Sequence, residues 1–271
     1  MTALTADRTA HAIEPAPTTP HGLVHVAEHG DDASWDRFVA GHPQSSAYLY
    51  SGWPRLIGRA FGHQIRMLAA ERGGAIAGVL PLVIMRSRLF GRFAISLPFL
   101  NAGGLLADDA AAGDALVNAA VRVAQDAQAN YLELRHTARL CPSLLERRHK
   151  VAMALGLESS ADRQWEVVDR KVRNQVRKAE KSGLTAAVGG DALLDAFYDV
   201  FARNMRDLGT PVFPMALFRE AVATYPDLTT VTCVYKGEQP IASGIVHRRG
   251  DWAEVVWASA LREFNPLCAN V

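Results

Sequence analysis

The strongest constraint on the fold is a strand–turn–strand pattern that occurs twice, at residues 65–84 and 230–247. In each copy a short apolar strand runs into a basic residue followed by glycine, Arg-Gly in the first and Lys-Gly in the second. A second apolar strand follows each turn, as expected for a β-hairpin. A duplicated hairpin at this separation predicts two similar domains in tandem.

The spacing of the hairpins also predicts how the chain is divided. About 80 residues separate the first hairpin from the end of its unit near residue 155, whereas about 30 follow the second hairpin. We therefore expect a first domain at residues 22–160 and a second, truncated domain at residues 161–271. Residues 1–21 are rich in Ala, Thr and Pro, which predicts a disordered tail.

Hydrophobic periodicity predicts an α+β order of elements around each hairpin. Alternating apolar residues indicate strands, and an apolar stripe at helical spacing indicates amphipathic helices. Strands are expected at residues 22–28, 95–100, 131–135, 150–155 and 252–258. Helices are expected at residues 34–39, 50–61, 110–129, 165–182, 191–208 and 214–225, with Ser34 as the cap of the first and a further helix beginning near residue 270.

Composition narrows the classes of function. The 271 residues include 29 Lys and Arg against 28 Asp and Glu, so no overall charge favours nucleic acid or membrane binding. Three separated cysteines have neither metal nor redox spacing, which fits a reducing compartment. No segment has the roughly 18–20 apolar residues of a membrane span, and the N-terminus lacks the apolar stretch of a signal peptide. We expect a cytoplasmic protein that does not bind DNA.

The order of elements resembles the GNAT acyltransferase fold, and two such units in tandem resemble the FemAB-like transferases. A more specific resemblance is to the FemAB-like proteins associated with exosortase/PEP-CTERM systems of Gram-negative bacteria. The segments that carry it are Gly78-Val-Leu-Pro-Leu82, Arg86-Ser-Arg-Leu-Phe-Gly91, Ser96-Leu-Pro-Phe99, Gly103-Gly104, Leu132-Glu-Leu-Arg135, Phe197-Tyr198, Asn204-Met-Arg-Asp-Leu-Gly-Thr-Pro-Val212 and Trp257-Ala-Ser259. Members of that family continue into a helix and further strands, which agrees with the expected truncation.

The resemblance implies transfer of an acyl or aminoacyl group to an amine of a polar cell-envelope or exopolysaccharide precursor, linked to a nucleotide or a lipid. The activated donor is expected to be aminoacyl-tRNA or an acyl-CoA. No loop expected from the sequence carries the Arg/Gln-x-x-Gly-x-Gly/Ala motif with which CoA-dependent GNAT enzymes bind pyrophosphate, and this makes acetyl-CoA a less favoured donor. A CoA-dependent N-acetyltransferase, a non-catalytic scaffold in polysaccharide assembly and an RNA-binding module stay open as alternatives.

Two carboxylates are candidates for the base that deprotonates the attacking amine. Glu254 lies on the strand after the second hairpin, where GNAT-like enzymes often place such a group. Glu133 shares one face of the expected strand 131–135 with Arg135, because side chains alternate along a strand. Arg135 is a candidate for binding polar substrate together with Glu133. The alternative interpretations are an exposed carboxylate for Glu254 and a structural ion pair for Glu133 and Arg135.

The expected helix at residues 165–182 is basic on one side. Arg170, Arg177 and Lys181 gather opposite an apolar stripe that includes Val172 and Val176. Such a basic strip suits the phosphates of a tRNA or of a nucleotide-linked sugar precursor. The alternative interpretation is a solvated helix face.

Further candidates for substrate binding lie at a helix end and in a glycine loop. Arg206 and Asp207 are expected at the end of a helix that faces a loop, from which they could line a substrate cleft. Tyr198 could offer a hydroxyl group in the same region. Asn101 precedes two glycines, in a loop where backbone can approach a ligand closely. Capping, core packing and an ordinary turn are the alternative interpretations.

Metal binding is not expected. His21, His25 and His29 are spaced by four residues, and on a strand this spacing places neighbours about 13 Å apart. The sequence contains no serine elbow, HExxH motif or catalytic Cys/His pattern.

Overall fold

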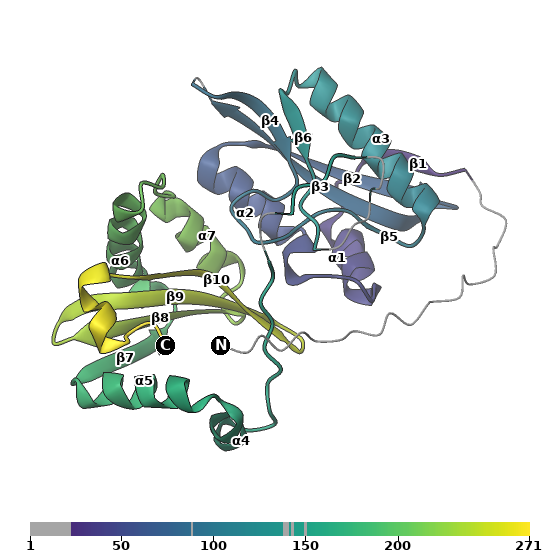
Figure 1. Cartoon of the computed structure of the whole chain (residues 1–271). Helices are drawn as coiled ribbons and strands as arrows, with labels where there is room; N and C mark the ends of the chain where they lie inside the picture. The colour runs from purple at the N-terminus through teal and green to yellow at the C-terminus, as the bar shows by residue number, and fades with distance from the viewer. Residues whose placement is uncertain (1–22, 88, 138–140, 142–143, 149–150) are drawn as a thin grey trace.

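The computed structural model describes residues 23–87, 89–137, 141, 144–148 and 151–271. The expected tail at residues 1–21, His21 and the start of the strand expected at residues 150–155 lie outside these ranges. The described chain forms two sheets, each with its own helices (Figure 1). No described helix is both long and apolar enough to cross a membrane.

The first unit is built around a six-stranded sheet. Its strand order is β1-β2-β3-β4-β6, with β5 paired to β3, and only the β4–β6 pair is parallel. The elements are β1 (His25–Glu28), α1 (Asp32–Gly41), η1 (Ala47–Leu49), α2 (Gly52–Phe61), β2 (Gln64–Arg72), β3 (Ala75–Ser87), β4 (Gly91–Ile95), β5 (Leu106–Ala107), α3 (Ala110–Asp126) and β6 (Tyr131–Glu133).

The second unit is built around a four-stranded antiparallel sheet of order β10-β9-β8-β7. Helices α6 and α7 pack on one side of it, and α5 lies beside β7 (Figure 1). The elements are α4 (Ala161–Val167), α5 (Arg170–Lys181), β7 (Leu184–Gly189), η2 (Asp191–Leu193), α6 (Leu194–Asp207), α7 (Met215–Thr224), β8 (Thr229–Lys236), β9 (Gln239–Arg249), β10 (Trp252–Ala260) and η3 (Arg262–Leu267).

The two units repeat one order of elements. The series β1-α1-α2-β2-β3-β4 has the same order as β7-α6-α7-β8-β9-β10, and neighbouring strands pair in the same sequence in both sheets. Both expected hairpins are confirmed, with Gly73 and Gly237 at positive φ angles of 57° and 62° in the turns. Glycine suits these positions because it has no Cβ to oppose a left-handed backbone. The predicted α+β class with two mostly antiparallel sheets is confirmed.

One hydrophobic core runs through both units. It contains Trp35 and Trp53 from the first unit together with Phe197, Phe218 and Trp257 from the second. Trp53 is fully buried, and its ring lies 5.5 Å from Tyr225 and 6.3 Å from Trp257. Truncating a buried aromatic of this kind costs about 3–5 kcal/mol. Residues on both sides of the expected boundary at residue 160 belong to this core. The boundary therefore stays a prediction.

Equivalent helices of the repeat pack against each other. Helix α2 contacts α7, and Arg59 donates to Glu220 at 2.7 Å and to Thr224 at 3.0 Å across the contact. The helices approach so closely that a Cβ built on Gly52 would lie 2.3 Å from the hydroxyl of Tyr225. Glycine at position 52 is thus required by the packing of the two units and not by local backbone conformation.

The structure corrects several expected boundaries in the first unit. Helix α1 is capped by the Asp31 carboxylate, which accepts from the Ala33 N–H, and Ser34 lies inside the helix. The strand expected at residues 95–100 ends at Ile95. The following residues form a loop, because Leu97 and Phe99 have positive φ angles that end strand geometry. The described part of the segment expected as a strand at 150–155 pairs with no described strand, and its side chains are exposed.

One expectation in the second unit also changes. The helix expected at residues 165–182 is divided into α4 and α5, because Asp169 caps a new helix by accepting from the Lys171 N–H. The helix whose start is expected at residues 270–271 would continue past the described residues, so it stays a prediction. A 3-10 helix at Arg262–Leu267 precedes that position, and it includes Pro266.

Candidate active site at the junction of the two units

The loop that follows β4 is held in a strained conformation by Arg135. The backbone N–H of Arg135 donates to Ser96 Oγ at 2.8 Å, and its guanidinium donates to the Leu100 carbonyl at 3.3 Å. The Gly103 N–H in turn donates to the Arg135 carbonyl at 2.9 Å. These bonds stabilise a loop in which two residues other than glycine have positive φ angles. Backbone strain of this kind gathers at functional sites.

The same loop joins the first unit to the second. Phe99 stacks on Phe61 with ring centroids 4.1 Å apart and meets Phe213 edge-on at 5.3 Å. Its carbonyl accepts from the indole N–H of Trp257 on β10 at 3.2 Å. The loop and β10 are therefore fixed relative to each other.

Asn101 and Glu254 meet across this junction. The Asn101 amide donates to Glu254 Oε1 at 2.7 Å, although 153 residues separate the two in the chain. Asn101 is exposed and Glu254 is half-buried, so a ligand can reach the carboxylate. We refer to Tyr48, Asn101, His247 and Glu254 together as the junction site.

Tyr48 brings a buried hydroxyl group toward this carboxylate. Burial, followed by the nearby negative charge of Glu254, raises the pKa of Tyr48 well above its ordinary value. The phenol therefore keeps its proton at neutral pH. Within the described residues, no contact of its hydroxyl has the full geometry of a hydrogen bond. The phenol is thus a protonated group beside Glu254 and Asn101, and hydrogen bonding with these two residues also contributes to its pKa.

His247 lies opposite Glu254 on the neighbouring strand. The two residues are Cα partners in the β9–β10 register, so their side chains share one face of the sheet. His247 is 2% exposed, and its ring lies 5.0 Å from the rings of both Trp53 and Tyr225. Burial, with the charge of Arg249 second, lowers the pKa of His247 to about 4. The imidazole is therefore neutral at pH 7.

Four buried polar atoms near Trp53 have no hydrogen bond of full geometry within the described residues. They are Tyr48 Oη, Trp53 Nε1, Tyr225 Oη and His247 Nε2. An unpaired buried polar atom costs about 1–3 kcal/mol, so a cluster of them calls for a functional explanation. The rings of Tyr48, Tyr225 and His247 pack around Trp53, and of these residues Tyr48 has an electrostatic interaction with Glu254.

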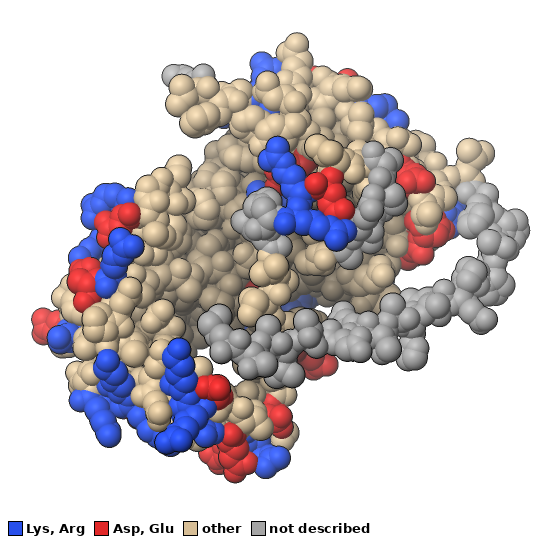
Figure 2. Space-filling view, in the orientation of Figure 1, with Lys and Arg blue, Asp and Glu red and all other residues tan. Residues whose placement is uncertain are grey.

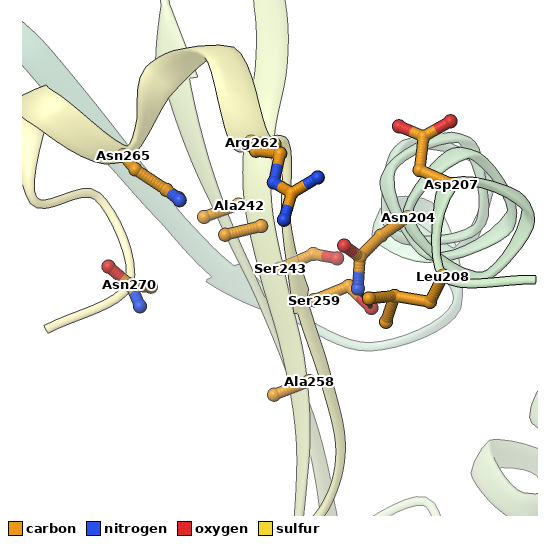
Figure 3. Close-up of a pocket in the computed structure, with 11 residues that line it drawn as sticks. Asn204, Asp207, Leu208, Ala242, Ser243, Ala258, Ser259, Arg262, Asn265 and Asn270 are labelled. Carbon is orange, nitrogen blue, oxygen red and sulfur yellow. Dashed lines mark hydrogen bonds between the residues drawn. The ribbon is translucent and has the colours of Figure 1, made fainter.

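A polar cavity of about 520 Å³ lies further along β10 (Figure 3). Asn204 at the end of α6 donates to Ser259 Oγ at 3.1 Å on one wall. Arg262 extends from the chain after β10 toward α6, and Asn265 and Asn270 face the same space (Figure 3). This volume is within the range of small-molecule sites. The amide, hydroxyl and guanidinium groups suit a polar or anionic ligand.

A β-bulge lies between the junction site and the cavity. The β9–β10 register shifts between Val255 and Trp257, so that one extra residue is accommodated in β10. Beyond the bulge Trp257 faces Ile245 and Ser259 faces Ser243, on the same side of the sheet as Glu254. Within the described chain, β10 pairs only with β9, and its other edge is free.

The structure places the second candidate base in an ion pair. Arg135 Nε donates to Glu133 Oε1 at 2.7 Å, and the Glu133 carbonyl accepts from the Ser96 N–H at 2.9 Å. Both residues thus support the loop that carries Asn101. The geometry favours a positioning role for them over direct contact with the reacting groups.

The other candidates lie away from the junction carboxylate. Tyr198 donates to the Phe213 carbonyl at 3.1 Å and so fixes the segment between α6 and α7. Arg206 and Asp207 are exposed at the end of α6, and Asp207 lines the polar cavity. The structure therefore connects Asp207 with a possible ligand site but not with Glu254.

The basic helix lies at the opposite edge of the second sheet. Helix α5 contacts β7, whereas Glu254 is on β10 at the other end of the strand order. Arg170, Arg177 and Lys181 are exposed on α5, and Lys and Arg side chains gather there in Figure 2. A second, shallow cavity there is lined by Arg170 and other residues of α5 together with Cys268. The expected phosphate contacts are thus not brought together with the candidate base.

Sequence reasoning did not select Tyr48 or His247. His247 could have been found from the tight turn at Gly250-Asp251, because pairing Arg249 with Trp252 also pairs His247 with Glu254. Tyr48 had no comparable signal, since a tyrosine near a helix start is usually a core residue. Among the described residues, no group of three or more His, Cys, Asp or Glu is arranged to hold a metal ion.

The arrangement defines a class of fold: two α+β units with one order of elements in tandem, with a candidate site at their junction. Residues 168–270 match the family described as an acetyltransferase (GNAT) domain. The chain is similar to a crystal structure of FemX, with 13% identity, 91% of this chain and 83% of that chain covered, and a TM-score of 0.58. It is also similar to a tandem GNAT protein from the clavulanic acid biosynthesis pathway, with 11% identity, 89% and 80% coverage, and a TM-score of 0.49. No curated protein matches the chain.

Proposed function

We propose that the protein is an acyltransferase of FemAB type that acts on an amine of a polar cell-envelope or exopolysaccharide precursor. The observation that carries this proposal is the Asn101–Glu254 hydrogen bond of 2.7 Å, which orients a carboxylate where the two GNAT-type units meet. The exosortase-associated branch and a cytoplasmic location are finer parts of the proposal, and they rest on the sequence resemblance and composition.

The geometry supports general base catalysis by Glu254. Asn101 occupies one carboxylate oxygen, which leaves the other free to accept a proton from the attacking amine. As the amine nitrogen bonds to the carbonyl carbon of the donor, the ester or thioester bond breaks and the amine proton passes to Glu254. The protonated Tyr48 hydroxyl is a suitable donor to the oxyanion or to the leaving group.

The free edge of β10 favours an extended acceptor over a small amine. Glu254 and Ser259 lie on one face of this strand, and five residues of strand span about 15 Å. A precursor with its amine at Glu254 could place a carboxylate, phosphate or sugar in the polar cavity beside Arg262. A nucleotide- or lipid-linked precursor has this length and polarity.

A CoA-dependent N-acetyltransferase is the second candidate, favoured by the family description of residues 168–270. The two donors can be separated by ligand-induced stabilisation. A rise in melting temperature with acetyl-CoA but not with an aminoacyl-tRNA would favour the acetyltransferase. The reverse result would favour FemAB-type transfer.

The catalytic assignment is tested by Glu254→Gln. Glutamine keeps an oxygen for the Asn101 amide but cannot accept the amine proton, so transfer to an amine-bearing nucleotide sugar should fall about 10²–10⁴-fold. Glu238→Gln, at the exposed turn before β9, is the matched control and should retain full activity. Full activity of Glu254→Gln with an unchanged melting temperature would show that this carboxylate is not the base.

A further inference from the structure

The hairpin between β3 and β4 ends in an exposed apolar tip. Leu89 and Phe90 are 81% and 72% exposed. Their backbone N–H groups donate to Ser87 Oγ at 3.3 and 3.1 Å. The hairpin projects outward at one end of the first unit (Figure 1). Two adjacent large apolar side chains are therefore exposed to solvent at this end of the hairpin.

Arginines surround this tip. Residues 85–93 include three arginines and no acidic residue. Arg86 and Arg92 are direct partners in the β3–β4 register, and like charges in such a pair repel each other. Arg92 donates to the Ala127 carbonyl at 3.3 Å and to Gln128 at 3.0 Å, whereas exposed Arg86 has no partner within the described residues. An external anion would relieve the repulsion.

An aromatic pair lies behind the arginines. Phe93 on β4 stacks on Tyr131 of β6 with centroids 4.8 Å apart, and Tyr131 is 46% exposed. The order of side chains along the hairpin matches the order of layers at a bilayer surface. Apolar residues lie at the tip, as the acyl chains would require, and the cations and the half-exposed tyrosine follow at the level of the headgroups.

We propose that this end of the first unit docks on an anionic lipid bilayer. Leu89 and Phe90 enter the boundary between acyl chains and headgroups, Arg86 and Arg92 bind lipid phosphates, and Tyr131 lies at headgroup level. A protein groove could also cover two apolar side chains. The arginines without acidic neighbours favour a surface of phosphates instead. The proposal does not depend on the transfer reaction.

Vesicle flotation of the full chain tests the proposal. Binding to phosphatidylglycerol vesicles should exceed binding to pure phosphatidylcholine vesicles at least tenfold and should fall at high salt. The double variant Leu89→Ser/Phe90→Ser should lose at least tenfold in affinity, because most of the inserted apolar surface is removed. Arg86→Gln should weaken binding at low salt and reduce its salt dependence.

A matched double variant, Leu145→Ser/Leu157→Ser, changes two leucines that are 96% and 70% exposed elsewhere and should bind as the unaltered protein does. Equal binding to neutral and anionic vesicles, or binding that survives Leu89→Ser/Phe90→Ser, would overturn the proposal. Self-association that requires Leu89 and Phe90, without vesicle binding, would assign the tip to a protein contact and would overturn it as well.

Discussion

Protonation of His247 is expected to destabilise the folded protein as the pH falls. The imidazole is 2% exposed between the rings of Trp53 and Tyr225. Burial first, and the charge of Arg249 second, lower the pKa of His247 from 6.5 to about 4. The folded state therefore excludes a proton that the unfolded chain accepts.

The sign and size of the effect follow from linkage. Above pH 6.5 neither state binds the proton, so His247 adds no pH dependence. Between pH 6.5 and about 4 only the unfolded state is protonated, and the free energy of unfolding falls by about 1.4 kcal/mol per pH unit. The total loss is about 3 kcal/mol, a large share of the roughly 5–15 kcal/mol of a typical domain.

Urea unfolding at pH 7.0, 5.5 and 4.5, followed by tryptophan fluorescence, measures this loss. In His247→Asn the side-chain oxygen can still accept from the Thr229 hydroxyl, but nothing titrates at this position. The variant should be less stable at pH 7, yet it should lose about 2 kcal/mol less than the unaltered protein between pH 7.0 and 4.5. His25→Asn, at an exposed site, should follow the unaltered protein. Parallel pH profiles for His247→Asn and the unaltered protein would refute the reasoning.

Two further predictions concern the helix contact and the basic helix. Gly52→Ala should destabilise by about 1–3 kcal/mol in urea melts, because its Cβ would lie 2.3 Å from the Tyr225 hydroxyl. Adding Tyr225→Phe to this variant should recover part of the lost stability. Gly41→Ala is the control, and it should cause no loss because a Cβ at Gly41 meets open space. Equal losses of stability at both glycines would contradict the packing argument. Arg177→Ala/Lys181→Ala should weaken aminoacyl-tRNA binding at least tenfold at low salt and less at high salt. Arg122→Ala on α3 is its control, and unchanged affinity of the double variant would show that the basic face of α5 does not bind the tRNA.

The elements that sequence patterns predicted correctly are those decided by neighbouring residues. The two hairpins follow from glycine in turns that need a positive φ angle, and α3 and α6 follow from apolar stripes at helical spacing. One error has a local cause, since the Asp169 cap divides the helix expected at residues 165–182. Another arose where a distant contact overrides local preference. The apolar run at residues 95–100 resembles a strand, yet hydrogen bonds from Arg135 bend it into a loop.

For the candidate site too, the sequence identified single residues and the tertiary structure determined their contacts. The choice of Glu254 and Asn101 as separate candidates came from the sequence, through a strand position and a glycine-containing loop. Their contact depends on the packing of two units, because 153 residues lie between them and no local pattern reports that distance. The separation of α5 from the site has the same cause, since strand order places β7 and β10 at opposite edges of one sheet.

By itself, the sequence determined the duplicated α+β order, because turn chemistry and hydrophobic periodicity act within a few residues of the chain. Only the tertiary structure decided that Tyr48, Asn101, His247 and Glu254 lie at one junction. The physical reason is that a shared hydrophobic core around Trp53 holds the units together, and burial in that core changes the protonation of the groups it encloses.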